Sequence, residues 1–305
     1  MGSHVSKNYP LVSVAIITYN QKQYLIECIE SCLAQDYPNF EIVVADDGST
    51  DGTKEILMGY SVKFPGKFVL RFATENRGIT LNSNLAHFSC SGKYVAWLGG
   101  DDLMLDGRLA KQVEYLEENP KCSIVYSDSE VFNSETGEVI DLSSNLSPKV
   151  VGGGVVDMIN LGCFVGGCTA MVRRDATPCY GFDVRMPIAS DWKYWIDTLR
   201  YGGTVDYLEG LYSRHRRHDN NVTNKDKGDF KIGNYQDHLM TCEIVLTENP
   251  KLKRYVLNAE SRIFRAMRFY EGGRYYRDYL ALSMSRRFNL KAFVAYIVSF
   301  FSVFL

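Results

Sequence analysis

Three groups of carboxylates stand where this chain could do chemistry. Asp46-Asp47 and Asp101-Asp102 each follow a short apolar run, and Asp191 stands directly before Trp192. Mg²⁺ and Mn²⁺ prefer oxygen ligands and often need only one or two protein carboxylates when substrate phosphates supply further ligands. A carboxylate beside aromatic rings can have a raised pKa and accept a proton from a hydroxyl. These residues therefore point to a phosphorylated substrate, a divalent metal and a base.

The segments around the first acidic pair predict an α/β sheet that would position it. The run from Leu11 to Ile17 is rich in β-branched residues and too short for a buried helix, so we predict a central strand covered on both faces. Apolar residues at helical spacing from Tyr24 to Leu33 predict a helix, and Phe40 to Ala45 predicts a second, parallel strand. Because ligands bind beyond the carboxyl ends of strands in open α/β sheets, Thr18–Asn20 and Asp46–Ser49 should meet at one site.

The connections after these strands argue against several other phosphate-binding classes. No Gly-x-Gly-x-x-Gly joins a predicted strand to a helix, and no Walker phosphate loop occurs. Dinucleotide-dependent oxidoreductases and phosphate-loop nucleoside triphosphatases therefore lose support. A nucleotidyltransferase remains an alternative because it shares a related architecture and metal chemistry. That class would need a glycine-rich, basic signature near the first strand, and Thr18–Gln21 has none.

Five blocks follow one another in a characteristic order along the chain. They are Val12–Thr53, Asn76–Ile79 with Asn84, Gly92–Asp102, Gly181–Asp183 with Ser190–Trp195, and Arg216–Thr223. Together they resemble glycosyltransferase family 2, the nucleotide-sugar-dependent enzymes of GT-A fold. The resemblance implies a Rossmann-like, mostly parallel α/β sheet flanked by helices. It also implies a metal-dependent, inverting transfer from a nucleotide diphosphate sugar to an acceptor hydroxyl, with Mn²⁺ or Mg²⁺ as cofactor.

The resemblance assigns roles to particular residues. Nucleotide-sugar contacts are expected from Thr18, Tyr19, Asn20, Asp46, Asp47, Arg77, Asn84 and Asp102, metal contacts from Asp101 and His218, and acceptor contacts from Trp192, Trp195 and Cys168. Asp191 is the expected catalytic base. The chain departs from the family at Gly99, where the first aspartate of Asp-x-Asp usually stands. This departure keeps open a non-catalytic sugar-nucleotide-binding protein with a degenerate metal site.

Each of these residues also has a purely structural interpretation. Both acidic pairs adjoin glycines and suit turn or helix N-cap chemistry. Asp191 can likewise begin a helix that runs to Leu199. His218 lies close to His215, and lone histidines are more often structural than metal-binding.

The acidic turn and the positions of the tryptophans bear on the expected nucleobase and on the mode of transfer. A carboxylate can accept a hydrogen bond from the imide N–H of uracil or thymine, a group that cytosine lacks. We therefore expect a UDP-sugar donor, with a TDP-sugar next. The processive synthases of the family carry Gln-x-x-Arg-Trp, but the only tryptophans here are Trp97, Trp192 and Trp195. A hexosyltransferase that adds a single sugar is therefore expected.

Composition divides the chain into one large domain and a basic tail. With 305 residues and 46% hydrophobic content, the chain can hold an α/β domain plus an appendage. We expect a tag over residues 1–8, a GT-A domain over residues 9–223 and a helical C-terminal region over residues 224–305. Residues 251–305 hold eleven Lys and Arg against three acidic residues, a net charge of +8, although the whole chain carries −2.

The tail ends in an uncharged apolar run at residues 292–305. This run is shorter than the about 20 residues of a membrane-spanning helix, so we expect a peripheral anchor on an anionic inner membrane leaflet. Alternatives are packing on the domain, packing on a second subunit of a homodimer, or the start of a longer membrane segment. The expected acceptor is a lipid-linked glycan or other saccharide in the synthesis of a surface polysaccharide such as O-antigen or capsule. No nucleic-acid-binding module is recognised, so no such partner is expected.

The remaining features suggest a cytoplasmic protein. Eight cysteines lack any Cys-x-x-Cys pair, and Cys28, Cys32, Cys90 and Cys122 stand in apolar runs, which indicates buried, reduced thiols. Nothing near the N-terminus has the pattern of a signal peptide. The polar segment from Gly137 to Val151 is expected to be an ordinary surface loop, with a mobile lid as the alternative.

Overall fold

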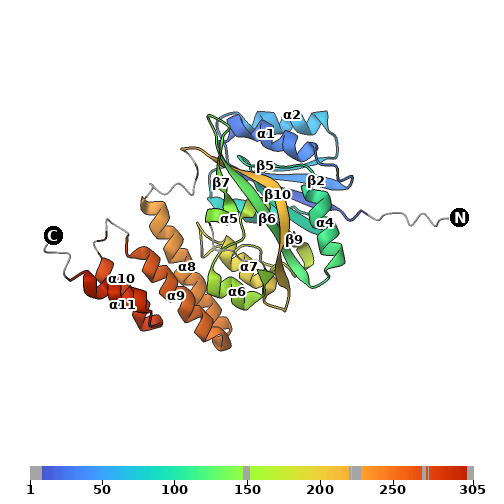
Figure 1. Ribbon diagram of the computed structural model, residues 1–305. Coiled ribbons are helices and arrows are strands. Elements are labelled where there is room, and N and C mark those ends of the chain that lie inside the picture. The colour runs from blue at the N-terminus through green and yellow to red at the C-terminus, as the bar shows by residue number, and fades with distance from the viewer. Residues whose placement is uncertain are drawn as a thin grey trace.

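The computed structural model describes residues 9–146, 152–219, 221, 228–269, 273 and 275–300 (Figure 1). The expected tag and the expected domain end at Thr223 lie outside these residues. The strands are β1 Val12–Thr18, β2 Phe40–Asp46, β3 Phe68–Phe72, β4 Tyr94–Gly99, β5 Leu103–Met104, β6 Cys122–Asn133, β7 Val139–Leu142, β8 Gly152–Gly153, β9 Met171–Arg173 and β10 Thr204–Arg217. The helices of the same part are α1 Lys22–Leu33, α2 Thr53–Lys63, α3 Ile79–His87, α4 Arg108–Glu118, α5 Ser143–Leu146, α6 Val155–Leu161 and α7 Asp191–Leu199, with the 3-10 turn η1 at Gly167–Thr169.

One mixed sheet organises these elements. Its strand order is β3-β2-β1-β4-β9-β6-β10-β5, with β7 on β6 and β8 on β10. The strands β3, β2, β1 and β4 are parallel, and β9 is antiparallel to both β4 and β6. The predicted α/β fold with a mainly parallel sheet is confirmed. The register sets Thr18 opposite Asp46 and Ile17 opposite Gly99, so the ends of β1, β2 and β4 form one edge.

Strand β1 shows why the fold needs two layers of helices. Val12, Val14 and Ile16 belong to one core cluster with α1 and α4, whereas Ala15 belongs to a second cluster on the opposite face. All four side chains are fully buried. Successive strand residues point to opposite faces, so a strand buried on both sides reads as a continuous apolar run.

The C-terminal part is helical, with α8 Gly228–Glu248, α9 Lys253–Met267, α10 Tyr276–Arg286 and α11 Leu290–Val298. Figure 1 shows α8 and α9 beside α6 and α7, with α10 and α11 farther from the sheet. Buried residues of α8 and α9, such as Cys242 and Ile263, belong to the same core cluster as Trp195 of α7. Within the described residues, no helix has both the length and the apolar character to cross a membrane.

One sequence expectation about the fold is wrong in part, and another is confirmed. The segment from Gly137 onward is not an ordinary loop, because its described residues, 137–146, include β7 and α5. The polar composition of this segment gave no indication of β7, which pairs antiparallel with β6. The cysteines are free thiols, and Cys28, Cys32, Cys90 and Cys122 are buried as predicted.

Candidate active site

The first acidic turn is built by hydrogen bonds between the ends of β1 and β2. Asp47 N donates to Thr18 O at 3.1 Å, and Asn20 N donates to Ser49 Oγ at 2.8 Å. Asn20 adopts a positive φ of 50°, which an asparagine tolerates better than most residues. These contacts bring Thr18, Asn20 and the Asp46-Asp47 pair together as predicted, and Tyr19 between them is exposed.

The two carboxylates of this turn have different partners. Asp46 accepts hydrogen bonds from Ser49 N at 3.2 Å and from the Ser49 hydroxyl, and burial raises the pKa of Asp46 against the lowering effect of these bonds. Asp47 accepts from Arg77 N at 2.9 Å and Gly78 N at 2.8 Å, one bond on each carboxylate oxygen. Asp47 therefore fixes the segment that leads into α3, and Arg77 enters the turn through its backbone.

Two asparagines of α3 connect this helix to neighbouring segments through side-chain hydrogen bonds. Asn84 was expected to contact the nucleotide sugar, but its amide donates to Phe182 O at 2.8 Å and accepts from Phe182 N at 2.7 Å. In this position Asn84 fastens α3 to the segment before α7. Asn82, which the sequence reasoning missed, donates to Ala45 O at 3.0 Å and Thr18 O at 3.3 Å. Its place three residues after Ile79, on the inward face of α3, could have indicated this role.

The second acidic pair meets the last predicted block through β10. His218 Nε2 lies 3.0 Å from Asp101 Oδ2, and Asn221 Nδ2 lies 3.2 Å from the same oxygen. Arg216 is buried, and its Nε donates to Asp101 O at 2.8 Å while its backbone N–H donates to Asp102 Oδ1 at 3.0 Å. The structure thus joins Asp101 and His218, which are 117 residues apart in sequence, and adds Asn221.

The donor set of Asp101 and His218 fits an octahedral divalent ion. Two neighbouring ligands on bonds of about 2.1 Å in an octahedron stand about 3 Å apart, which matches the separation of the carboxylate oxygen and the imidazole nitrogen. Gly99 adds no ligand, but it matters sterically. A Cβ at position 99 would lie 2.7 Å from Asp101 Oδ1. The glycine therefore allows the present position of Asp101.

Asp102 lies on the other side of this turn and faces different partners. Its Oδ1 lies 3.1 Å from His215 Nδ1, and its side chain is 7% exposed. Burial alone would lower the pKa of His215, but hydrogen bonds with Asp102 and Cys168 outweigh it and raise that pKa to about 11. When no ion is bound, Asp102 therefore favours the protonated form of His215.

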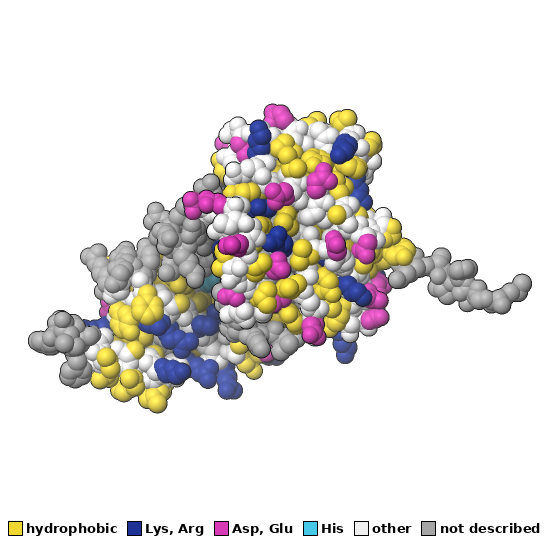
Figure 2. Space-filling view, turned by 45° about the horizontal axis from the view of Figure 1, so that its top comes forward, with side chains coloured by type: hydrophobic (Ala, Val, Ile, Leu, Met, Phe, Trp, Pro, Cys, Tyr) yellow, Lys and Arg dark blue, Asp and Glu magenta, His cyan; other side chains and the backbone are white. Residues whose placement is uncertain are grey.

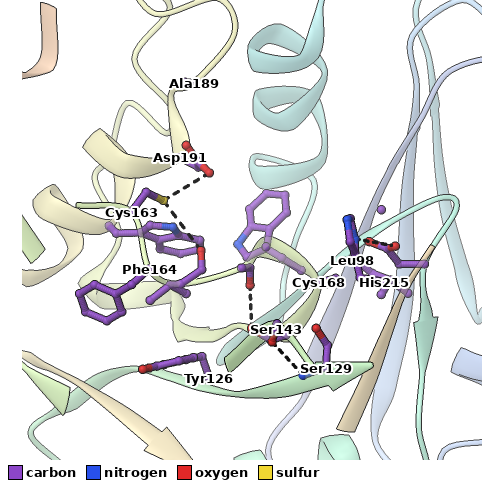
Figure 3. Close-up of a pocket in the computed structure, with 18 of the residues that line it drawn as sticks. Leu98, Tyr126, Ser129, Ser143, Cys163, Phe164, Cys168, Ala189, Asp191 and His215 are labelled. Carbon is purple, nitrogen blue, oxygen red and sulfur yellow. Dashed lines mark hydrogen bonds and ion pairs between the residues drawn. The ribbon is translucent and has the colours of Figure 1, made fainter. Parts of the chain in front are cut away.

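A cavity of about 1140 Å³ connects this acidic end to the predicted base. Gly99, Asp102, His215 and Cys168 line one part of it, and Asp191 lines another. Figure 3 shows His215 and Cys168 on one side of this space and Asp191 with Cys163 on the other. Of the residues that the resemblance assigned to the site, Asp102, Cys168, Asp191 and Trp195 line this cavity. The expected metal ligands Asp101 and His218 and the turn residues Thr18, Asp46 and Asp47 are not part of its lining.

Asp191 begins α7 and is oriented by two donors. Its Oδ1 accepts from Trp192 N at 2.8 Å, and its Oδ2 accepts from Cys163 Sγ at 3.5 Å. Burial and the charge of Asp191 raise the pKa of the Cys163 thiol, which keeps the sulfur protonated and able to donate. Cys163 was missed by the sequence reasoning because it lies 28 residues before Asp191 in an ordinary apolar segment.

The two tryptophans of α7 differ in their access to the cavity. Trp195 lines the cavity, although its ring is 1% exposed. Trp192 is equally buried, and its Nε1 donates to Met158 O at 2.9 Å, so its ring serves the packing of α6 on α7. Trp192 is not part of the cavity lining, so its position gives no support to the expected sugar contact.

The cavity also has walls that the sequence reasoning did not identify. Asp128 of β6 accepts from Ser143 Oγ and Ser144 Oγ at 2.5 Å each, which holds α5 at the cavity edge. These bonds lower the pKa of Asp128 although burial opposes them. From α8, Asn234 and His238 also line the cavity. Residues so far apart in sequence carry no common motif.

Comparisons with known proteins agree with this geometry. The model of "Glycosyl transferase family 2" matches residues 13–180, more than half of the chain. The chain belongs to glycosyltransferase family 2. It is 27% identical over 217 residues to "Putative teichuronic acid biosynthesis glycosyltransferase TuaG" of Bacillus subtilis, covering 70% of this chain and 82% of that protein. It is 29% identical over 226 residues to an uncharacterized glycosyltransferase of Haemophilus influenzae, covering 71% of this chain and 68% of that protein.

Solved structures show the same fold at low identity. TarS residues 1–349 of S. aureus in complex with UDP-GlcNAc superposes with a TM-score of 0.67 at 18% identity, covering 91% of this chain and 81% of that one. The mannosyltransferase PcManGT of Pyrobaculum calidifontis, in complex with GDP-Man and Mn²⁺, gives 0.63 at 20% identity, covering 97% and 81%. The GT-A type of fold is thereby confirmed for this family 2 glycosyltransferase.

Proposed function

We propose that this glycosyltransferase moves a single sugar from a UDP-sugar to an acceptor hydroxyl with inversion at the anomeric carbon. The observation that carries the proposal is the single cavity shared by Asp102, next to the candidate metal ligands, and Asp191. A leaving diphosphate and an attacking hydroxyl must lie at opposite sides of the sugar in one displacement. The cavity offers an acidic turn for the first and a carboxylate for the second.

Asp191 takes the proton of the acceptor hydroxyl in this mechanism. The hydrogen bonds from Trp192 N and the Cys163 thiol hold the carboxylate in one orientation at the wall of the cavity. Trp195 and the backbone of the η1 turn limit the space beside it. A divalent ion held by Asp101 and His218 would neutralise the negative charge that develops on the leaving diphosphate.

Two observations support a uridine nucleotide. The Asp46-Asp47 pair stands at the strand end where the nucleobase is expected, and Asp47, the second aspartate, is fixed there by the backbone N–H groups of Arg77 and Gly78. The TarS structure with the higher of the two similarities above contains UDP-GlcNAc. The PcManGT complex contains GDP-Man, so the nucleobase needs a direct test.

The acceptor side is proposed to serve a surface polysaccharide on a lipid carrier. The Bacillus relative is named for teichuronic acid biosynthesis. The surface of the C-terminal helices is compatible with a membrane, because Phe288, Leu290 and Val294 are 66%, 66% and 51% exposed. Figure 2 shows Lys and Arg side chains gathered beside hydrophobic ones on this part of the molecule. A basic and apolar face suits peripheral binding at an anionic leaflet.

The donor and the metal are tested by thermal unfolding with UDP, TDP and GDP and their sugars, each with and without Mn²⁺. We expect the melting temperature to rise with UDP-sugars, further with Mn²⁺, and the Mn²⁺-dependent part to vanish in Asp101→Ala. Binding that ignores Mn²⁺ would favour a non-catalytic sugar-nucleotide-binding protein. The anomeric configuration of the product, read by NMR, tests inversion.

The membrane part is tested by sedimentation with vesicles of neutral or anionic lipid. The full chain should co-sediment with anionic vesicles and lose this binding when Phe293–Leu305 is deleted. Transfer to a lipid-linked acceptor should then fall while transfer to a soluble saccharide persists. Equal activity of both forms on both acceptors would contradict the role of the tail.

A further inference from the structure

A second cluster of metal-ligating side chains lies beside the Asp101 and His218 pair. Asp102, Cys168 and His215 each offer one ligand atom, and these three atoms lie within 4.8 Å of one another. They come from three separate segments, namely the turn after β4, the η1 turn and β10. All three side chains line the cavity. Neither Asp101 nor His218 belongs to this set.

The cluster is held in place by buried hydrogen bonds rather than left to side-chain flexibility. Ser213 Oγ donates to Cys168 O at 2.7 Å, and Gln112 Nε2 donates to Thr169 O at 2.7 Å, so two of the three carbonyls of the η1 turn are fixed by side chains. Ser213 and Gln112 are fully buried. Asp102 Oδ1 accepts from Arg216 N and pairs with His215 Nδ1. Such outer partners orient metal ligands and strengthen a site.

The ligand types determine which ion would fit. Thiolate, imidazole and carboxylate together are typical of Zn²⁺, and three protein ligands with an open fourth position are typical of sites that exchange their ligands. Mg²⁺ and Mn²⁺ prefer oxygen and avoid thiolate. Ligand atoms around tetrahedral Zn²⁺ stand about 3.3–3.8 Å apart, so closing the cluster needs movements of about 1 Å.

We propose that Asp102, Cys168 and His215 form a binding site for Zn²⁺ or a similar thiophilic divalent cation, separate from the site for the nucleotide-bound ion. The Cys168 thiol and the His215 ring release protons to the solvent when the ion binds. The open position of this site faces the cavity. An ion there occupies space beside the acidic turn where the donor sugar must lie. Zn²⁺ therefore competes with the sugar nucleotide and inhibits transfer, and this consequence alone rests on the proposed function.

The site is tested first with Co²⁺ as a spectroscopic substitute for Zn²⁺ on the full chain. Wild type should show thiolate-to-cobalt charge-transfer absorption, and Zn²⁺ should displace it. Cys168→Ser should remove the absorption, whereas the exposed Cys179 gives a matched control, Cys179→Ser, that retains it. Asp101→Ala should also retain it. Because the loss of even an outer partner weakens metal binding about 10- to 100-fold, loss of the thiolate should weaken Zn²⁺ binding at least as much.

A measurement on the unaltered protein covers the case in which Cys168→Ser folds poorly. The alkylation rate of each cysteine is followed by mass spectrometry with and without Zn²⁺, and Cys168 should be protected while Cys179 is not. Absence of the absorption band, its persistence in Cys168→Ser, or unchanged alkylation of Cys168 would each overturn the proposal. The three residues would then be a hydrogen-bonded support for the η1 turn. A present band without Mn²⁺-dependent nucleotide binding would keep the Zn²⁺ site and reject the proposed function.

Discussion

The donor end and the acceptor end of the candidate site are built in different ways. At the donor end, Asp47 and Asp102 accept backbone N–H groups from Arg77, Gly78 and Arg216, and the register of the parallel strands sets their positions. At the acceptor end, Asp191 depends on its own helix and on a thiol. The donor end is thus a product of the sheet, whereas the acceptor end is a product of helix packing. We therefore expect the donor end to tolerate few substitutions and the acceptor end to tolerate more.

Among the substitutions that test this difference between the two ends, removal of the base should have the largest effect on the transfer rate. Asp191→Asn keeps the size and the hydrogen bond to Trp192 N but cannot take the acceptor proton, so we expect transfer to fall about 10²- to 10⁴-fold. Donor binding should stay unchanged, because the donor end is held by other residues. Rates and the nucleotide-dependent thermal shift are measured side by side. A parallel loss of both would show that the two ends are not independent.

Restoring the usual aspartate of the family should harm this protein. In Gly99→Asp the new Cβ would lie 2.7 Å from Asp101 Oδ1 and force that carboxylate to move. We expect the affinity for Mn²⁺ to fall about 10- to 100-fold, as it does when a ligand loses its support. Titration of Mn²⁺ in the presence of UDP measures it, with Gly59→Asp, at a glycine with open space around its Cβ position, as the control. A tighter Mn²⁺ site would mean that Gly99 is a true defect.

His87 lies between β4 and α7, and its protonation provides a test of how the two elements pack. It stacks on Trp97 of β4 at 6.4 Å, and its Nδ1 lies 3.3 Å from Tyr194 Oη of α7. Burial lowers the pKa of His87 to about 4 from 6.5. The unfolded chain therefore binds the proton more readily between these values, and the free energy of unfolding falls as the pH drops through this window.

The expected slope is about 1.2 kcal/mol per pH unit between pH 6 and pH 5. His87→Phe should remove this part of the slope, which urea unfolding at the two pH values measures. An identical slope in both proteins would show that His87 is not buried as a neutral ring.

The smallest effect is expected from the thiol that orients the base. Cys163→Ala removes a weak hydrogen bond to Asp191 Oδ2, so we expect kcat to fall a few-fold without a change in the donor KM. Cys163→Ser, which keeps a donor, should recover most of the rate. If the donor KM changes instead, Cys163 supports the sugar rather than the base.

The donor end could be predicted from sequence because its residues follow strands directly. The apolar runs before Asp46 and Asp101 set both the sheet and the position of the carboxylates. The acceptor end could be predicted only at Asp191. Cys163, Asn234 and His238 reach the cavity through the packing of α6, α7 and α8, and no short-range pattern records that packing. Asn84 and Trp192 match the family motif but have structural contacts, because a motif gives residue types and not side-chain directions.

The core that α8 and α9 share with α7 limits how this protein can be shortened. Cys242, Val245 and Ile263 cover the same apolar cluster that holds Trp192 and Trp195. A fragment that stopped where the family model ends, at residue 180, would lack Asp191 itself. One that stopped before α8 would expose a large tryptophan-rich surface and is expected to aggregate. The shortest fragment that folds without aggregating should therefore extend through Met267. Crystallisation trials should begin with a fragment that ends at this residue.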